Sequence, residues 1–188
     1  MTSTQLFSLE GKVAIITGGS RGLGREMALA FADHGADVVI ASRKVETCEG
    51  VANEIRAKGR KALAIGYHAA SWADADSLAE QALAHFGHVD VLVNNAGMSP
   101  LYSSLVEVSE ELYDKVLGVN LKGPFRLSTL IATHMCSEQA DGTVRGGSII
   151  NVSSIASQRP SPNEVVYGAA KAAINNLTVG LAHTYGPH

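Results

Sequence analysis

Two residues near the end of the chain, Tyr167 and Lys171, have the types and the spacing of an acid–base pair. Residues four apart in a helix lie on the same face, so the two side chains would be neighbours. A phenol is a poor base near neutral pH, because its ordinary pKa is about 10. A nearby ammonium group favours the phenolate, which can then exchange a proton with a substrate oxygen. The pair alone is common in proteins, so its meaning depends on the residues around it.

A second chemical feature is the glycine-rich segment TGGSRGLG at residues 17–24. Glycines let a backbone turn tightly and approach a pyrophosphate, and a helix that starts there offers free N–H groups. The spacing GxxxGxG differs from the GxGxxG of the general dinucleotide fingerprint, and a plain tight turn is the alternative interpretation. The position between an apolar run and an amphipathic one favours a dinucleotide-binding loop. Its candidate residues are Gly18, Ser20, Arg21, Gly22, Leu23 and Gly24.

The end of the second apolar run, IASRK at residues 40–44, bears on the choice of cofactor. Sites for NAD usually place Asp or Glu here to bind the ribose 2′-hydroxyl, and this segment has no carboxylate. Ser42 can donate a hydrogen bond to a 2′-phosphate, and Arg43 can pair with it. Arg21 in the glycine loop could reach the same group. The sequence therefore predicts a preference for NADP(H), with NAD(H) possible and a solvated Arg43 as the alternative.

The elements that would position these residues alternate between short apolar runs and longer amphipathic ones. Strands are expected at 13–17, 37–41, 62–66, 89–94 and 148–152, and helices at 22–34, 45–58, 74–86, 109–134 and 165–185. Gly118, Gly123 and Pro124 can kink or interrupt the fourth helix. Strands that are apolar throughout indicate a parallel sheet covered on both faces. The prediction is an α/β, doubly wound, Rossmann-type fold in one domain spanning residues 1–188.

Further polar clusters follow the last two predicted strands, at the sheet edge where such folds bind ligands. Asn94 to Gly97 form the sequence NNAG, and Ser153 and Ser154 follow the fifth strand. TGxxxGxG, NNAG, an asparagine at position 120, the serine pair and YxxxK occur in this order. Together they resemble the short-chain dehydrogenase/reductase family along essentially the whole chain. The chain looks similar to its NADP(H)-dependent carbonyl reductase and 3-oxoacyl-(acyl carrier protein) reductase-like members.

The resemblance assigns roles to the catalytic candidates. Tyr167 would be the general acid or base at the substrate oxygen, and Lys171 would hold the nicotinamide ribose and lower the tyrosine pKa. Ser154, rather than Ser153, would hydrogen-bond the substrate carbonyl. Asn120 would hold a water in a proton relay behind the lysine.

The resemblance also assigns residues to the cofactor cleft and the sheet. Asn95, Ala96 and Gly97 would line the cleft, whereas Asn94 would mainly support the sheet. His68 stands after the third strand, where family members often carry an aspartate near the adenine.

The expected function is hydride transfer between NADP(H) and a carbonyl or secondary alcohol. The alternatives are a non-catalytic dinucleotide-binding sensor or scaffold, and a subunit that contributes only its helices to an oligomer. The family makes its main dimer contact with the helices at 109–134 and 165–185, which implies a homodimer or homotetramer. Family members continue with two more strands and a loop over the substrate. We therefore expect that the chain continues beyond residue 188, with a true fragment as the alternative. Without those segments the sheet would expose an apolar edge strand, and the sequence does not identify the substrate.

Composition excludes several other classes. The net charge of −3 gives no reason to expect a nucleic acid or an anionic membrane as partner. The basic run at residues 56–61 is better explained as cations near a helix C-terminus. Cys48 and Cys136 lack a CxxC pattern, and residues 1–10 lack a signal peptide, so a cytoplasmic protein is expected. No metal site is expected, because Gly87 separates His85 from His88 and no third ligand is near.

Overall fold

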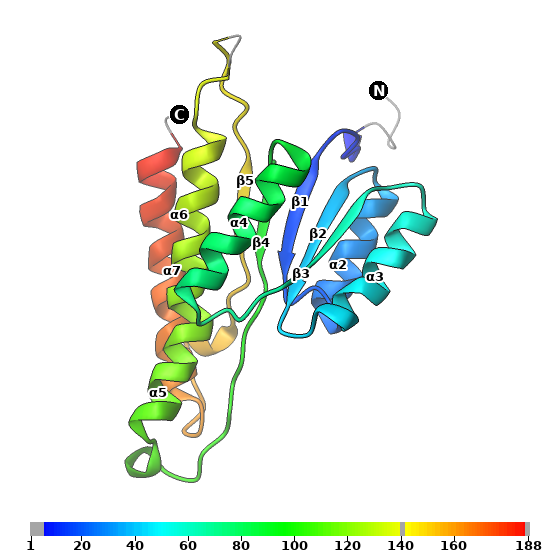
Figure 1. Cartoon of the computed structure of the whole chain (residues 1–188). Coiled ribbons are helices and arrows are strands. Elements are labelled where there is room, and N and C mark those ends of the chain that lie inside the picture. The colour runs from blue at the N-terminus through cyan, green and yellow to red at the C-terminus, as the bar shows by residue number, and fades with distance from the viewer. Residues whose placement is uncertain (1–5, 140–141, 187–188) are drawn as a thin grey trace.

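The computed structural model describes residues 6–139 and 142–186, which contain one five-stranded parallel sheet. The strand order is β3-β2-β1-β4-β5 (Figure 1). The strands are β1 Val13–Thr17, β2 Asp37–Ser42, β3 Ala62–Gly66, β4 Val91–Asn94 and β5 Ser148–Asn151. Residues 1–5, which belong to the segment judged to lack a signal peptide, lie outside the described residues, as do residues 140–141 and 187–188.

Helices cover both faces of this sheet, which confirms the predicted doubly wound α/β fold. Helices α2 (Gly22–Asp33) and α3 (Val45–Ala57) pack on one face, where Ala28 and Val51 meet Ile40. Helices α4 (Trp72–Phe86) and α6 (Gly123–Met135) pack on the other, where Leu78 and Leu127 contribute to the core. Helices α5 (Glu110–Leu117) and α7 (Val165–Tyr185) meet through Val116, Val166 and Ala170, below and beside the sheet in Figure 1.

Most element boundaries agree with the sequence prediction, and the differences have local causes. Helix α4 begins at Trp72, two residues early, because the Ser71 hydroxyl accepts a hydrogen bond from the Asp74 amide and caps the helix. Strand β4 begins at Val91, two residues late. Just before it, the Asp90 carboxylate accepts the Val13 amide at 2.9 Å and pairs with Lys12. Within the described residues, no helix has both the length and the apolar character needed to cross a bilayer.

The predicted interruption of the 109–134 helix is a wide, π-helical turn, η2 (Gly118–Lys122). Both glycines of this region pack on the segment after β3. A Cβ atom at Gly118 would lie 2.8 Å from the Ala70 Cβ, and one at Gly123 would lie 1.7 Å from the Ala69 carbonyl oxygen. Only glycine allows these two approaches, and π-turns of this kind often mark functional sites. The turn contains Asn120, which is buried.

Strand β5 corrects one prediction. Strands β1, β2 and β4 are largely buried and β3 is partly buried, but Ser148 and Ile150 of β5 are exposed, Ile150 by 44%. The prediction of burial on both faces is therefore wrong for β5. It pairs with β4 alone among the described strands and so forms the sheet edge, while α2 and α3 cover the opposite half. The expected exposed apolar edge strand is confirmed.

Candidate active site

A threonine hydroxyl joins the turn after β1 to the segment after β4. The Thr17 hydroxyl donates to the Val93 carbonyl at 3.2 Å and accepts the backbone N–H groups of Asn95 and Ala96, both at 3.0 Å. The Asn95 side-chain amide donates back to the Thr17 carbonyl at 2.9 Å. Two of the predicted polar clusters are thus fixed to each other at the carboxyl edge of the sheet. The threonine itself was absent from the predicted site.

The glycine loop has the shape of a phosphate cradle. Gly18 and Gly22 have φ of +66° and +53°, in the left-handed region that favours glycine. A Cβ atom at Gly24 would lie 2.3 Å from the Gly18 carbonyl oxygen, so only glycine lets α2 start this close to the loop. The N-cap residue Arg21 makes no side-chain capping bond, which leaves the first amides of α2 for a ligand. These features fit a pyrophosphate.

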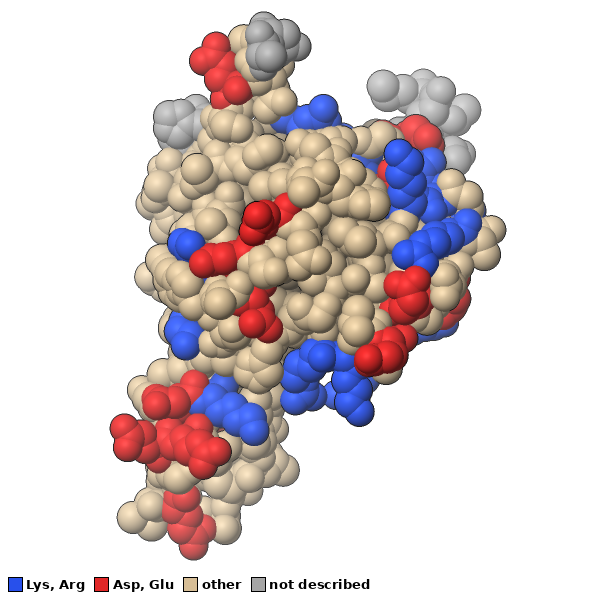
Figure 2. Space-filling view, viewed as in Figure 1, with Lys and Arg blue, Asp and Glu red and all other residues tan. Residues whose placement is uncertain are grey.

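Basic side chains surround this cradle. Arg21 follows β1, and Arg43 and Lys44 follow the adjacent strand β2, so their turns are neighbours. All three are exposed, and none forms an ion pair within the described residues. Figure 2 shows basic side chains gathered at the lower edge of this half of the molecule. The surface would suit an additional phosphate.

Two predicted cofactor residues make contacts that the sequence does not reveal. The Ser42 hydroxyl lies 3.0 Å from the Cys48 thiol and 3.5 Å from the Lys44 carbonyl oxygen. His68 is exposed after β3, the strand beyond β2, and its backbone amide donates to Asp74 at 2.8 Å. The imidazole of His68 has no hydrogen bond within the described residues.

The predicted lysine is a buried cation at the centre of the site. Lys171 is 5% exposed, and its ammonium donates to the Val152 carbonyl at 2.6 Å. The ammonium nitrogen lies 5.7 Å from the centroid of the Tyr167 ring. Burial lowers the pKa of Lys171. Within the described residues no carboxylate pairs with this ammonium, so its charge is available to a ligand.

Asn120 lies close to Gly97, as this lysine does. Its side-chain amide donates to the carbonyl oxygens of Met98 and Val116, both at 2.9 Å, and its oxygen accepts the Met98 amide at 3.4 Å. A Cβ atom at Gly97 would lie 3.0 Å from the Asn120 Oδ1 and 3.7 Å from the Lys171 Nζ. The structure therefore brings three predicted site residues together, although they come from distant parts of the chain.

Ser154 stands at the start of a short helix, η3 (Ile155–Ser157), and its hydroxyl accepts the Ala156 amide at 3.2 Å. Helix α7 packs closely on η3, since a Cβ atom at Gly168, next to Tyr167, would lie 2.6 Å from the Ala156 carbonyl oxygen. No hydrogen bond joins Ser154 to Tyr167 within the described part of the chain. Ser153 donates to the Lys171 carbonyl instead, at 3.4 Å.

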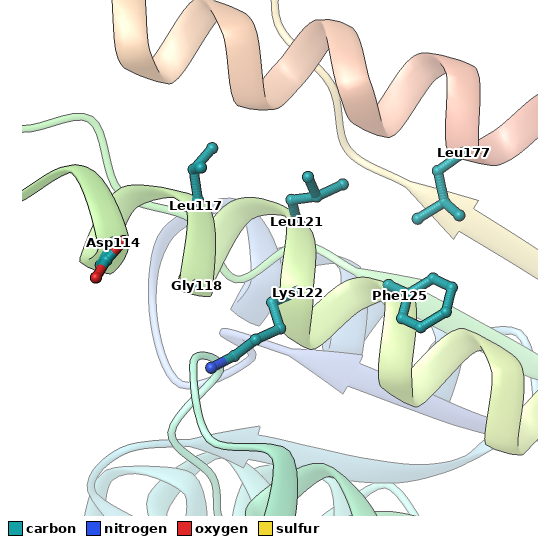
Figure 3. Close-up of a pocket in the computed structure, with 7 residues that line it drawn as sticks. All are labelled: Asp114, Leu117, Gly118, Leu121, Lys122, Phe125 and Leu177. Carbon is teal, nitrogen blue, oxygen red and sulfur yellow. The ribbon is translucent and has the colours of Figure 1, made fainter.

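A groove between α7 and the helix pair α5–α6 is lined by none of the predicted site residues, although it borders the turn that contains Asn120. Leu117, Leu121 and Leu177 point into the space between α7 and the helix pair α5–α6, with Phe125 beside Leu177, whereas Lys122 points away (Figure 3). The full lining is Asp114, Leu117, Gly118, Leu121, Lys122, Phe125 and Leu177. Because most of its lining is apolar, the groove is better suited to contact with another protein surface than to binding a dinucleotide.

Comparison with known proteins agrees with this geometry. An oxidoreductase of Thermotoga maritima, described as uncharacterised, is 38% identical over 95% of this chain and 67% of its own length. The structure of 3-ketoacyl-(acyl-carrier-protein) reductase from Brucella melitensis, complexed with NADH, is 39% identical with a TM-score of 0.87, covering 96% of this chain and 72% of that one. A blue fluorescent protein from a metagenomic library, in complex with NADPH, is 34% identical with a TM-score of 0.87, covering 96% and 71%.

The chain spans between 60% and 69% of the length of the curated relatives that it matches. The family profile described as short chain dehydrogenase matches residues 12–188. With this match, the shared fold and the relatives above, the chain belongs to the short-chain dehydrogenase/reductase family of oxidoreductases.

Proposed function

We propose that this chain binds NADP(H) and interconverts a carbonyl compound and a secondary alcohol. The observation that carries the proposal is the buried ammonium of Lys171. It lies beside the Tyr167 ring, close to Gly97, and has no carboxylate partner among the described residues. A buried cation without a counter-ion is costly, and such groups gather at functional sites.

The cofactor's place follows from the cradle at the start of α2. The pyrophosphate would lie against the uncapped amides at the start of α2. The left-handed backbone at Gly18 and Gly22 would let the loop approach the same pyrophosphate. Arg43 and Arg21 would face the 2′-phosphate, with Ser42 beneath them. NADPH and NADH each occur in a similar solved structure, so the preference for NADP(H) rests on these side chains. The proposed cofactor set is Gly18, Ser20, Arg21, Gly22, Leu23, Gly24, Ser42, Arg43, His68, Asn95, Ala96, Gly97, Tyr167 and Lys171.

The proposed chemistry divides between the dinucleotide and the chain. When bound, the dinucleotide supplies or accepts the hydride. The Tyr167 hydroxyl gives a proton to the carbonyl oxygen in reduction and takes it back in oxidation. Ser154 orients that oxygen by a hydrogen bond, and Lys171 binds the ribose hydroxyls and favours the tyrosine phenolate. Asn120 holds a water behind the lysine.

The test is NADPH oxidation, followed by absorbance with a panel of ketones, aldehydes and 3-oxoacyl thioesters. We expect turnover of at least one compound, and loss of that turnover in Tyr167→Phe with NADPH binding preserved. Phenylalanine keeps the ring but lacks the proton that the reaction needs. Activity retained in Tyr167→Phe would refute the acid–base role. NADPH binding without turnover of any compound would instead indicate a non-catalytic sensor or scaffold.

We also propose that a second copy of the chain covers the groove of Figure 3. Phe125 and Val179, on the two helices that border this region, are 39% and 54% exposed, which is costly for apolar side chains in water. Light scattering should give a dimer or tetramer mass, and Phe125→Glu should lower it. A monomer mass for the unchanged chain at micromolar concentration contradicts this assembly.

A further inference from the structure

One carboxylate outside the proposed catalytic set bridges two loops beside it. One oxygen of Glu164 accepts the Ser99 hydroxyl at 2.8 Å, and the other accepts the Ser161 hydroxyl at 2.9 Å. Ser99 belongs to the loop at residues 97–104 that follows β4, and Ser161 to the loop at 158–163 that follows η3. We call these three residues the clasp. Both bonds lie at the surface, where a hydroxyl-to-carboxylate bond is stronger than a neutral one but competes with water, so each arm restrains its loop modestly.

The clasp sits one helical turn from the proposed acid–base residue. Glu164 is the N-cap residue of α7, three positions before Tyr167 and seven before Lys171, so these side chains share one side of the helix. The Glu164 side chain makes no capping bond to its own helix. Its two oxygens accept hydrogen bonds from the two loops instead.

Other contacts show that both loops depend on this end of α7. The Tyr102 hydroxyl accepts the Val166 amide at 3.3 Å, a second link between the 97–104 loop and the first turn of α7. A Cβ atom at Gly168 would lie 2.7 Å from the Pro160 side chain, so the 158–163 loop also packs on that turn. Without the clasp these contacts would remain, and the loops would stay near α7 but lose their fixed separation.

The charge of Glu164 is secured by the same contacts. Hydrogen bonds from Ser99, then from Ser161, hold the pKa of Glu164 below its ordinary value. The positive end of the α7 dipole also favours a carboxylate at this position. Glu164 therefore stays ionised near neutral pH, and both serine hydroxyls point at it rather than into the space between the loops.

We propose that Glu164 is a positioning residue that fixes the separation of the 97–104 and 158–163 loops and thereby sets the affinity for the substrate. The inference rests on the proposed function, because the substrate would enter beside Tyr167 between these loops. A residue that holds the walls of a site in place lowers the ordering cost of binding more than it changes the chemical step. Its removal should therefore raise KM and leave kcat almost unchanged.

The test compares Glu164→Ala, Glu164→Gln and the double variant Ser99→Ala/Ser161→Ala with Glu80→Ala, an exposed position of α4, as control. We expect KM for the carbonyl substrate to rise about tenfold in Glu164→Ala and in the double serine variant, with kcat within about twofold and the NADPH Kd unchanged. Glu164→Gln should recover part of the loss, because its amide can still bond both hydroxyls. Adding Glu164→Ala to the double serine variant should change KM no further, since all three residues act as one unit.

Hydrogen–deuterium exchange supplies a readout that needs no turnover. Peptides covering residues 97–104 and 158–163 should exchange faster in Glu164→Ala than in Glu80→Ala, while α2 and β1 peptides stay unchanged. Equal exchange and equal KM in the two variants would overturn the inference. If the unchanged chain turns over none of the panel compounds, the proposed function and the kinetic role of Glu164 both fall. Faster loop exchange would then show that the clasp is structural only.

Discussion

The ammonium of Lys171 is held by the carbonyl oxygen of Val152, with the two atoms 2.6 Å apart. Val152 directly follows β5 and Lys171 lies in the second turn of α7, so this bond locks a helix to the end of the edge strand. It fixes where the charge is without neutralising it. A bound ligand with hydroxyl or phosphate oxygens would complete the coordination of the ammonium.

Replacing this lysine should separate binding from stability. Lys171→Met keeps the length of the side chain and removes a buried charge, so the free energy of unfolding should stay equal or rise. The NADPH Kd should rise about tenfold, the equivalent of roughly 1.4 kcal/mol, because the ribose contact is lost. Fluorescence titration and urea denaturation measure the two quantities, with the exposed Lys61→Met as control. An unchanged Kd would remove Lys171 from the cofactor site.

The glycine at the start of α2 should tolerate no side chain. A Cβ atom at Gly24 would lie 2.3 Å from the Gly18 carbonyl oxygen, so Gly24→Ala should cost about 1–3 kcal/mol and weaken NADPH binding. Gly50 in α3 has nothing within 4 Å of the same position. Gly50→Ala should therefore stabilise the chain by up to about 1 kcal/mol through helix propensity. Urea denaturation measures the unfolding free energy of both variants. Equal changes in the two would mean that the loop around Gly24 can move to make room for a side chain.

The basic edge beside the cradle should discriminate between the two nicotinamide cofactors. Arg43→Asp replaces an attractive charge by a repulsive one, so the Kd for NADPH should rise by about tenfold or more while that for NADH changes little. Lys61→Asp makes the same charge change just before β3, at the amino ends of the strands rather than their carboxyl ends. It should leave the Kd values for NADPH and NADH unchanged. Equal affinity of the unchanged chain for NADPH and NADH would contradict the predicted preference.

Acid should destabilise the chain in part through Asp74. A hydrogen bond from the Ser71 hydroxyl, then one from the His68 amide, lowers the pKa of Asp74 below its ordinary value. A carboxyl whose pKa is lower in the folded state stabilises that state at neutral pH. The stabilisation is lost as the pH falls through the folded-state pKa.

Asp74→Asn should therefore flatten the fall in unfolding free energy between about pH 5 and about pH 2, compared with the unchanged chain. Urea denaturation at a series of pH values measures this slope. Glu80→Gln, an exposed carboxyl in the same helix, serves as the control and should keep the original slope. Parallel curves for the unchanged chain and Asp74→Asn would show that these hydrogen bonds do not persist in solution.

The sequence predicts the frame of this molecule well, because apolar runs and capping residues are local signals. Strands β1 and β3 and helix α7 have the predicted bounds, and α5 follows directly on Ser109, whose hydroxyl accepts the Leu112 amide and caps the helix. The π-helical turn around Asn120 needs more than a local signal, since Gly118 packs on Ala70 from a distant loop. A glycine predicts an interruption there but not its form.

The site likewise combines features that local sequence signals predict with features that depend on distant contacts. The residue types at Tyr167 and Lys171 indicate acid–base chemistry, but nothing local predicts that Val152 holds the ammonium or that Thr17 joins two loops. Thr17 gave one usable signal, a polar residue that ends an apolar strand. Glu164 gave none, because an acidic residue at a helix start is ordinary and its serine partners are remote or in a loop.

The central position of β1 has a consequence for how the chain is made. Ala14 pairs with Val38 on one side and with Val91 on the other, and every residue of β1 is buried. During synthesis the β2 side is completed early, but the β4 side waits until the ribosome has released far more of the chain. Over that interval a nascent polypeptide carries the unpaired edge of a strand that is apolar except for its last residue, Thr17, the kind of surface that chaperones bind.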